Sequence, residues 1–198
     1  MSRVEENKQR KKTRLMENAF ALFTSKGIAK TSVSDIVEKA GMAKGTFYLY
    51  FKDKYDLQEK LTIQHTERLF RHAVEHSGYA ALPSADDRIL AVTDDILYQL
   101  KDDTRLLRFI SKNLSWSVFR RAIHRPDADH SDDIRSVLGC EPSAPVDLEL
   151  QSFFVLELVC STCCSVILEG DPVDLDHFLP YLHRSILAIL NSFRTPAP

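Results

Sequence analysis

The segment from Lys44 to Tyr50 carries side chains that could bind nucleic acid. Four groups that donate hydrogen bonds occur at short spacing, on Lys44, Thr46, Tyr48 and Tyr50. Phe47 and Phe51 lie four residues apart, so on a helix they would share the inward face and leave the polar groups outside. An ammonium, a small hydroxyl and phenols can bond to phosphate oxygens and base edges. The pattern therefore favours contact with a DNA groove.

Two short helices are predicted to position these groups, in the segment TSVSDIVEKAGMAKGTFYLYFKDK from Thr31 to Lys54. Ser32 can cap the first helix, with Asp35 supplying the acid of a capping box three residues later. Gly41 can adopt the left-handed conformation that ends a helix, and a second helix restarts near Ala43. The sequence thus predicts a helix-turn-helix, although a plain helical hairpin has the same outline.

A further helix is predicted before this segment. Apolar residues from Leu15 to Phe23 follow helical spacing, and Gly27 ends the pattern. The preceding residues 2–13 are polar and basic, which predicts a partly disordered arm or a solvated helix start.

Together these segments resemble the tetracycline-repressor (TetR/AcrR-type) family of bacterial transcription regulators. The resemblance rests on five short motifs: Phe20-Ala21-Leu22-Phe23-Thr24-Ser25-Lys26-Gly27, Thr31-Ser32-Val33, Ala40-Gly41, Lys44-Gly45-Thr46-Phe47-Tyr48 and Phe51-Lys52-Asp53-Lys54. It covers roughly the first third of the chain. Ala43 and Tyr50 depart from the commonest family pattern, which often has a capping Ser and a His at these positions.

The resemblance implies an all-α fold with two domains. We expect a three-helix, helix-turn-helix DNA-binding domain over residues 1–55 and a helical ligand-binding and dimerisation domain over residues 56–198. Gly45 would let the backbone approach the DNA, and Thr46 is small enough to touch a base edge or a thymine methyl group. The expected DNA surface consists of Thr31, Ser32, Lys44, Gly45, Thr46, Tyr48, Tyr50 and Lys54.

Charge is distributed unevenly along the chain. Residues 1–60 hold 13 Lys and Arg against 8 Asp and Glu, whereas the remainder holds 13 against 20. A basic head on an acidic body is expected of a protein that docks one part on phosphates. The opening residues show no leader pattern, and Glu157 interrupts the longest apolar region, so we expect a cytoplasmic protein without a membrane partner.

Helical patterns continue through the rest of the chain. A long helix follows Lys54, Ser84 can cap the next, and Lys101-Asp102-Asp103 predicts a break. Residues 125–147 contain three prolines and one short apolar patch around Ile134, Val137 and Leu138, which predicts a loop with a helical piece inside it. No alternating run long enough to form a sheet occurs.

The last two predicted helices, residues 147–169 and 174–193, are strongly apolar. The first is apolar on most sides and must be covered by more than its own core. The resemblance implies a homodimer formed through a four-helix interface, with Leu187 or Leu190 near its symmetry mate. Two heads would then bind two half-sites of a palindromic operator.

A ligand pocket is the least constrained expectation. We expect it inside the body, where aromatic side chains accompany one acid and would suit an apolar or cationic molecule. Alternatively, these aromatics simply fill the core. The expected lining is Phe109, Trp116, Phe119, Phe153, Phe154 and Glu157.

Other chemistries have weaker support. Cys160, Cys163 and Cys164 form a C-x-x-C-C cluster, for which buried packing is favoured over a thiol sensor. His72 and His76 lack the pattern of a metal site, and no Gly-rich phosphate loop or nucleophile elbow occurs. We therefore expect no enzyme, metal or cofactor. The favoured function is a ligand-responsive repressor that binds double-stranded operator DNA. The alternatives are an activator, a ligand-free regulator, a cysteine-based redox-sensing regulator and a helical adaptor that does not bind DNA.

Overall fold

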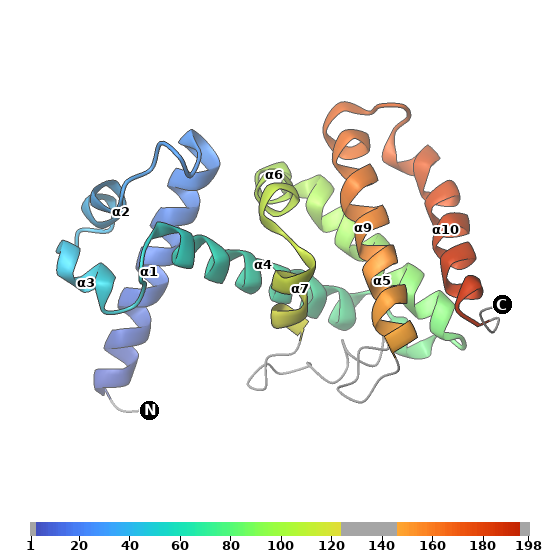
Figure 1. The fold of residues 1–198 in the computed structure, drawn as a ribbon, viewed down its shortest axis with the longest axis horizontal. Coiled ribbons are helices and arrows are strands. Elements are labelled where there is room, and N and C mark those ends of the chain that lie inside the picture. Colours follow the sequence, from blue (N-terminus) through green and yellow to red (C-terminus); the bar gives the residue numbers. More distant parts are fainter. Residues whose placement is uncertain (1–2, 124–145, 195–198) are drawn as a thin grey trace. The chain divides into compact units, whose positions relative to one another are not determined.

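The computed structural model describes residues 3–123 and 146–194, and all regular structure in these ranges is helical (Figure 1). The predicted apolar patch around Ile134 and Leu138 lies outside the described residues. By contacts, the chain divides into two compact units, residues 1–64 and 65–198, and the boundary falls within one long helix. The all-α prediction is confirmed for the described residues.

The first unit contains α1 (Arg3–Lys26), α2 (Val33–Lys39), α3 (Lys44–Tyr48) and the start of α4 (Lys54–His76). Its core is formed by side chains from all four helices, among them Leu15, Phe23, Ile36, Phe47, Phe51 and Leu57. The helix α1 continues back to Arg3, where the sequence predicts a partly disordered arm or a solvated helix start. Glu, Lys, Gln and Arg in this stretch are strong helix formers, and Glu5 and Glu6 stand at the positive end of the helix dipole.

The turns of the first unit follow the predicted signals. Ser32 caps α2, its hydroxyl accepts from the Asp35 backbone N–H, and the Asp35 carboxylate accepts from the Ser32 backbone N–H. Gly41 has a φ of 62°, the left-handed conformation that lets the chain leave α2 at low cost. The capping box and the glycine turn are therefore both confirmed.

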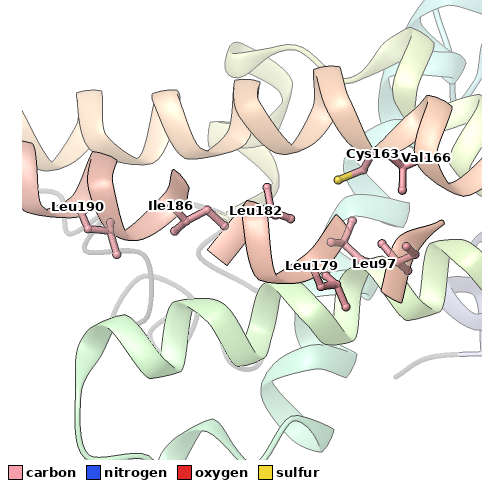
Figure 2. Packing of buried hydrophobic residues seen from close by; sticks show 8 residues of the cluster. Leu97, Cys163, Val166, Leu179, Leu182, Ile186 and Leu190 are labelled. Atoms are coloured by element: carbon pink, nitrogen blue, oxygen red, sulfur yellow. The ribbon is translucent and has the colours of Figure 1, made fainter. Parts of the chain in front are cut away.

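The second unit begins within α4 and continues through η1 (Tyr79–Ala81), α5 (Ala85–Asp102), α6 (Thr104–Asn113) and α7 (Trp116–Ile123). It ends with α9 (Val146–Glu169) and α10 (Leu175–Ser192). The Ser84 cap and the break before Thr104 are confirmed. Figure 2 shows the core where α5, α9 and α10 meet, with side chains including Leu97, Cys163, Leu182 and Ile186 pointing toward one another.

The helix α9 has more apolar surface than its own unit covers. By length and composition, the stretch Glu149–Glu169 could cross a membrane. Only 22% of its apolar part is buried inside the structure. Leu150 and Phe154 are exposed on this helix. The sequence expectation of a helix with unsatisfied apolar faces therefore agrees with the packing.

Candidate functional sites

The short helix α3 is held in place by Phe47 on the helix and Phe51 just after its end. Phe47 and Phe51 are buried, and their ring centroids lie 5.4 Å apart. The opposite side of α3 faces solvent: Lys44 and Gly45 are exposed, and Tyr48 is 54% exposed. Thr46 and Tyr50 are half-buried at the edge of this face. The predicted separation of inward phenylalanines from outward polar groups is thus present.

Two residues of the expected DNA surface are instead engaged inside the first unit. Thr31 is 1% exposed, and its hydroxyl donates to the Gly27 carbonyl at 2.8 Å. The Lys54 ammonium donates to the carbonyl oxygens of Ile28 and Thr31, at 2.9 and 3.0 Å. Lys54 therefore ties the start of α4 to the turn between α1 and α2. Both residues position the surface rather than present a free group to a ligand.

The start of α2 carries a strongly stabilised carboxylate. The hydrogen bond from the Lys26 ammonium, 2.8 Å long, and those from Ser32 lower the pKa of Asp35 to about 2. Asp35 therefore stays charged at neutral pH and fixes the orientation of α2 through Ser32 and Lys26. Ser32 itself remains exposed beside this cap.

Sequence reasoning missed one exposed apolar side chain at the end of α3. Leu49 is 79% exposed between the two tyrosines. An apolar group on an otherwise polar helix end can contact a thymine methyl group. The sequence indicates this exposure because Leu49 lies between Tyr48 and Tyr50. Phe47 and Phe51 already supply the core contacts of this segment.

Comparison with known proteins decides what this unit is. Residues 15–61, from within α1 to the start of α4, match the model of the family described as "Bacterial regulatory proteins, tetR family". This part of the chain is similar to bacterial regulatory proteins of the tetR family. The matched residues include the helix-turn-helix and every expected DNA-contact residue.

Curated relatives match this chain mainly over the same region. The uncharacterized HTH-type transcriptional regulator YvdT of Bacillus subtilis is 40% identical over 62 residues, 31% of this chain and 30% of that protein. The HTH-type transcriptional regulator TtgR of Pseudomonas putida is 34% identical over 59 residues, 30% and 28% of the two chains. The chain thus matches less than a third of the length of these two relatives.

Solved structures share the fold over most of the chain. A TetR-family transcriptional regulator from Streptomyces coelicolor matches with a TM-score of 0.65 and 17% identity, covering 92% of this chain and 99% of that one. The transcriptional regulator FadR from Bacillus subtilis, solved in complex with stearoyl-CoA, has a TM-score of 0.60 and 17% identity, covering 89% and 97%. The predicted architecture, a helix-turn-helix domain followed by a helical domain, is confirmed.

The second unit contains an apolar cavity of about 100 Å³. Helices α4, α5, α6, α7, α9 and α10 contribute to its walls. Most lining side chains are Leu, Ile and Val, and no charged residue is among the described residues that line it. Its polar lining groups belong to Thr66, Thr93, Ser111, Gln151, Ser152, Cys160 and Cys163.

Of the six residues expected to line a pocket, only Phe119 reaches this cavity. Trp116 lies behind it, its ring stacked on Phe119 at 5.4 Å, and Phe153 packs edge-on against Trp116. Phe109 is buried next to His65, whereas Phe154 and Glu157 are exposed. Aromatic residue type therefore does not identify the lining, because the cavity is formed mainly by the aliphatic faces of α5 and α9.

The cysteines of α9 are poorly suited to redox chemistry. Cys160 and Cys163 both line the cavity. Burial raises the pKa of the Cys160 thiol to about 12 and that of Cys163 to about 11. Because the thiolate is the reactive form, both groups stay protonated and slow to react at neutral pH. No metal-binding group of three or more ligands occurs among the described residues.

Of the two leucines expected at the dimer interface, Leu190 lies in the core of its own chain and Leu187 is partly buried beside it. Leu190 is 2% exposed and lines the cavity, and Leu187 packs against the same core cluster. Within the single chain, the surrounding helices therefore cover Leu190, whereas Leu187 keeps part of its surface open. The apolar side chains of α9 and α10 that do face solvent include Leu150, Phe154 and Tyr181.

Proposed function

We propose that this chain is a transcriptional regulator that binds double-stranded operator DNA as a homodimer and responds to a small molecule. One observation carries the proposal: the solvent-facing side of α3 presents donors on a helix whose back is fixed by Phe47 and Phe51. A rigid short helix with outward donors suits the major groove. The match of residues 15–61 to the tetR family supports this assignment.

The DNA surface has a contact part and a supporting part. Lys44, Tyr48 and Tyr50 donate to phosphates, Gly45 allows close backbone approach, and Thr46 meets a base edge. Ser32 lies at the start of α2 and bonds a phosphate from there. Thr31 and Lys54 hold the turn between α1 and α2 and act on DNA only through the position of these helices. Leu49 adds an apolar contact.

The dimer forms through the exposed faces of α9 and α10. Leu150, Phe154 and Tyr181 are large side chains with little cover, and α9 is apolar on faces that its own unit leaves open. Association of two copies would bury these faces in a four-helix interface. A second copy of the chain on these faces also accounts for the apolar character of α9 without a membrane. This agrees with a protein that works on DNA in the cytoplasm.

The cavity of the second unit is the effector site, and its occupancy changes DNA affinity. An effector that favours the non-binding arrangement by about 100-fold would oppose operator binding by ~2.7 kcal/mol. FadR from Bacillus subtilis, which shares the fold, was solved with stearoyl-CoA, so an apolar effector is compatible with this architecture. Release of operator by the effector would make the chain a repressor, and its recruitment to DNA would make it an activator.

The test is binding to the DNA that flanks the gene for this chain. Fluorescence anisotropy should show saturable binding to one flanking duplex, at least about 1,000-fold tighter than to a random duplex of the same length, the lower end for specific regulators. A Lys44→Ala, Tyr48→Phe variant should bind both duplexes more weakly. Equal affinity of the wild type for flanking and random DNA, at low and physiological salt, would contradict the proposal. No substrate turnover, metal or cofactor is part of this function.

A further inference from the structure

One hydroxyl group that lines the cavity of the second unit lacks a partner. The Thr66 side chain, on α4, is 1% exposed and lines the cavity. Its Oγ1 atom is buried and has no hydrogen-bond partner among the described residues. A buried hydroxyl without a partner destabilises the folded protein, so a group of this kind calls for an explanation.

Thr66 differs in this respect from other threonines on helices of the same chain. Thr62, Thr93 and Thr162 each donate their hydroxyl to the carbonyl four residues earlier, at 2.7 to 3.0 Å. Thr93 makes this bond although it lines the same cavity. The common way to satisfy a helical threonine is therefore used elsewhere, whereas the Thr66 hydroxyl remains available to an occupant of the cavity.

The rest of the lining restricts the chemistry of that occupant. The cavity walls are mainly aliphatic, and no Asp, Glu, Lys, Arg or His lines them among the described residues. An ion inside would lose its hydration without gaining a counter-charge, which excludes carboxylates and ammonium groups from the interior. The volume of about 100 Å³ is below that of an engineered cavity of about 150 Å³ that accepts benzene, so a small or flexible chain fits best.

We propose that the cavity binds an uncharged, mainly hydrocarbon molecule through one hydrogen bond between its hydroxyl or carbonyl group and Thr66 Oγ1. This inference rests on the proposed effector function and specifies the class of effector. Thr66 is the polar anchor, and Leu97, Ile110 and Val159 are among the aliphatic side chains that contact the hydrocarbon part. The anchor lies on α4, the helix that also contributes Leu57 and Leu61 to the core of the first unit.

Trp116 allows direct measurement of this binding. It is the single tryptophan of the chain, and its ring stacks on Phe119, which lines the cavity. Titrating the full-length protein with 1-hexanol and with heptane, which have equal numbers of non-hydrogen atoms, should change the emission in both cases. For the wild type, 1-hexanol should bind about 3- to 10-fold more tightly than heptane, beyond the difference in their solubility, because one neutral hydrogen bond is formed.

The matched variants are Thr66→Val and Thr93→Val, each of which removes a hydroxyl from the same cavity. Thr66→Val should abolish the preference for 1-hexanol, leave heptane affinity within about twofold, and raise the Tm of the ligand-free protein by about 2–4 °C. Thr93→Val should retain the preference, since its hydroxyl is already bonded to Ile89. Hexylammonium and hexanoate should bind at least about tenfold more weakly than 1-hexanol, because the interior offers no counter-charge.

Several outcomes would overturn the inference. An unchanged preference in Thr66→Val would show that Thr66 is not the anchor, and tighter binding of hexanoate or hexylammonium would show that the interior accepts charge. Tighter binding of hexanoyl-CoA than of 1-hexanol, unaffected by Thr66→Val, would place the recognised group outside the cavity. Absence of any binding would refute the cavity as a ligand site. These titrations contain no DNA, so failure of operator binding would be seen separately.

Discussion

Lys54 and Thr31 are joined by a 3.0 Å hydrogen bond from the lysine ammonium to the threonine carbonyl oxygen. The same ammonium bonds to the Ile28 carbonyl. A lysine beside a DNA-binding helix is easily assigned to phosphate binding, yet this lysine closes the turn on which α2 begins. Two lysines of the same unit should therefore have different effects: Lys54 on stability and Lys44 on DNA binding.

Replacing Lys54 by Met, which keeps the aliphatic stem, should lower the free energy of unfolding by about 1–2 kcal/mol, because this substitution removes charge-assisted hydrogen bonds to three carbonyls. Lys44→Met, on the exposed face of α3, should change stability by less than about 0.5 kcal/mol. Thermal and urea unfolding measure both. Equal stability of the two variants would contradict the structural role of Lys54.

Lys44 should act on DNA through charge alone. Lys44→Ala should weaken binding to operator and random duplexes alike, because it leaves one phosphate per head without its cationic partner. Because a dimer loses one phosphate contact in each of its two heads, the slope of log affinity against log salt should become shallower by about 1.8. Anisotropy titrations at several salt concentrations give this slope. A salt slope identical to that of the wild type would mean that Lys44 does not touch a phosphate.

The exposed face of α9 should control assembly. Phe154→Glu places a charge on that face and should yield monomers in sedimentation velocity at micromolar concentration, with loss of operator binding. The control is Ala80→Glu, an exposed position in η1 outside the proposed interface. A wild type that sediments as a monomer, or a Phe154→Glu protein that remains dimeric, would refute the interface.

Asp35 should give the first unit an acid-sensitive capping box. Its pKa is lowered from the ordinary 3.8 to about 2, mainly by Lys26, so the charged form stabilises the fold above pH 4. This stabilisation is lost as pH falls from about 4 through 2. The difference in Tm between the wild type and Asp35→Asn should therefore be constant near neutrality and shrink toward pH 2. A difference independent of pH would show that the charge contributes nothing.

Cys160 should be nearly inert in the folded protein. With its pKa at about 12, only a minute fraction is thiolate near neutral pH, so alkylation by iodoacetamide should be at least about 100-fold slower than for an unfolded control. Operator binding should also survive mild peroxide. Peroxide-induced release that disappears in a Cys160→Ser, Cys163→Ser variant would instead support redox sensing.

Local signals make much of the fold predictable. Ser32 with Asp35, Gly41, Ser84 and the break at Asp103 each act through neighbouring backbone, so their effect depends on few other residues. The spacing of Phe47 and Phe51 likewise determines which side of α3 is exposed. The residues before Leu15 are harder to predict because their charged side chains suit both a solvated helix and disorder.

The candidate sites are less predictable because they depend on distant partners. The carbonyls that bind Lys54 lie 26 and 23 residues away in the chain, beyond any local pattern. The cavity arises where six helices leave the space between them unfilled. The residue types of Phe109 and Glu157 therefore do not tell whether these side chains line it. Leu190 resembles an interface residue because surface and core leucines have the same periodicity on an apolar helix.

The most direct test of the central claim is a hydroxyl-radical footprint of the wild-type protein on the flanking DNA that it binds. We expect two protected sites of related, inverted sequence, on one face of the duplex and about 34–36 Å apart or a multiple of this distance, because two α3 helices enter successive major grooves. We also expect that Lys44→Ala weakens protection of both sites equally. A single protected site, or protection that follows no two-fold symmetry, would contradict a dimer that binds DNA through α3.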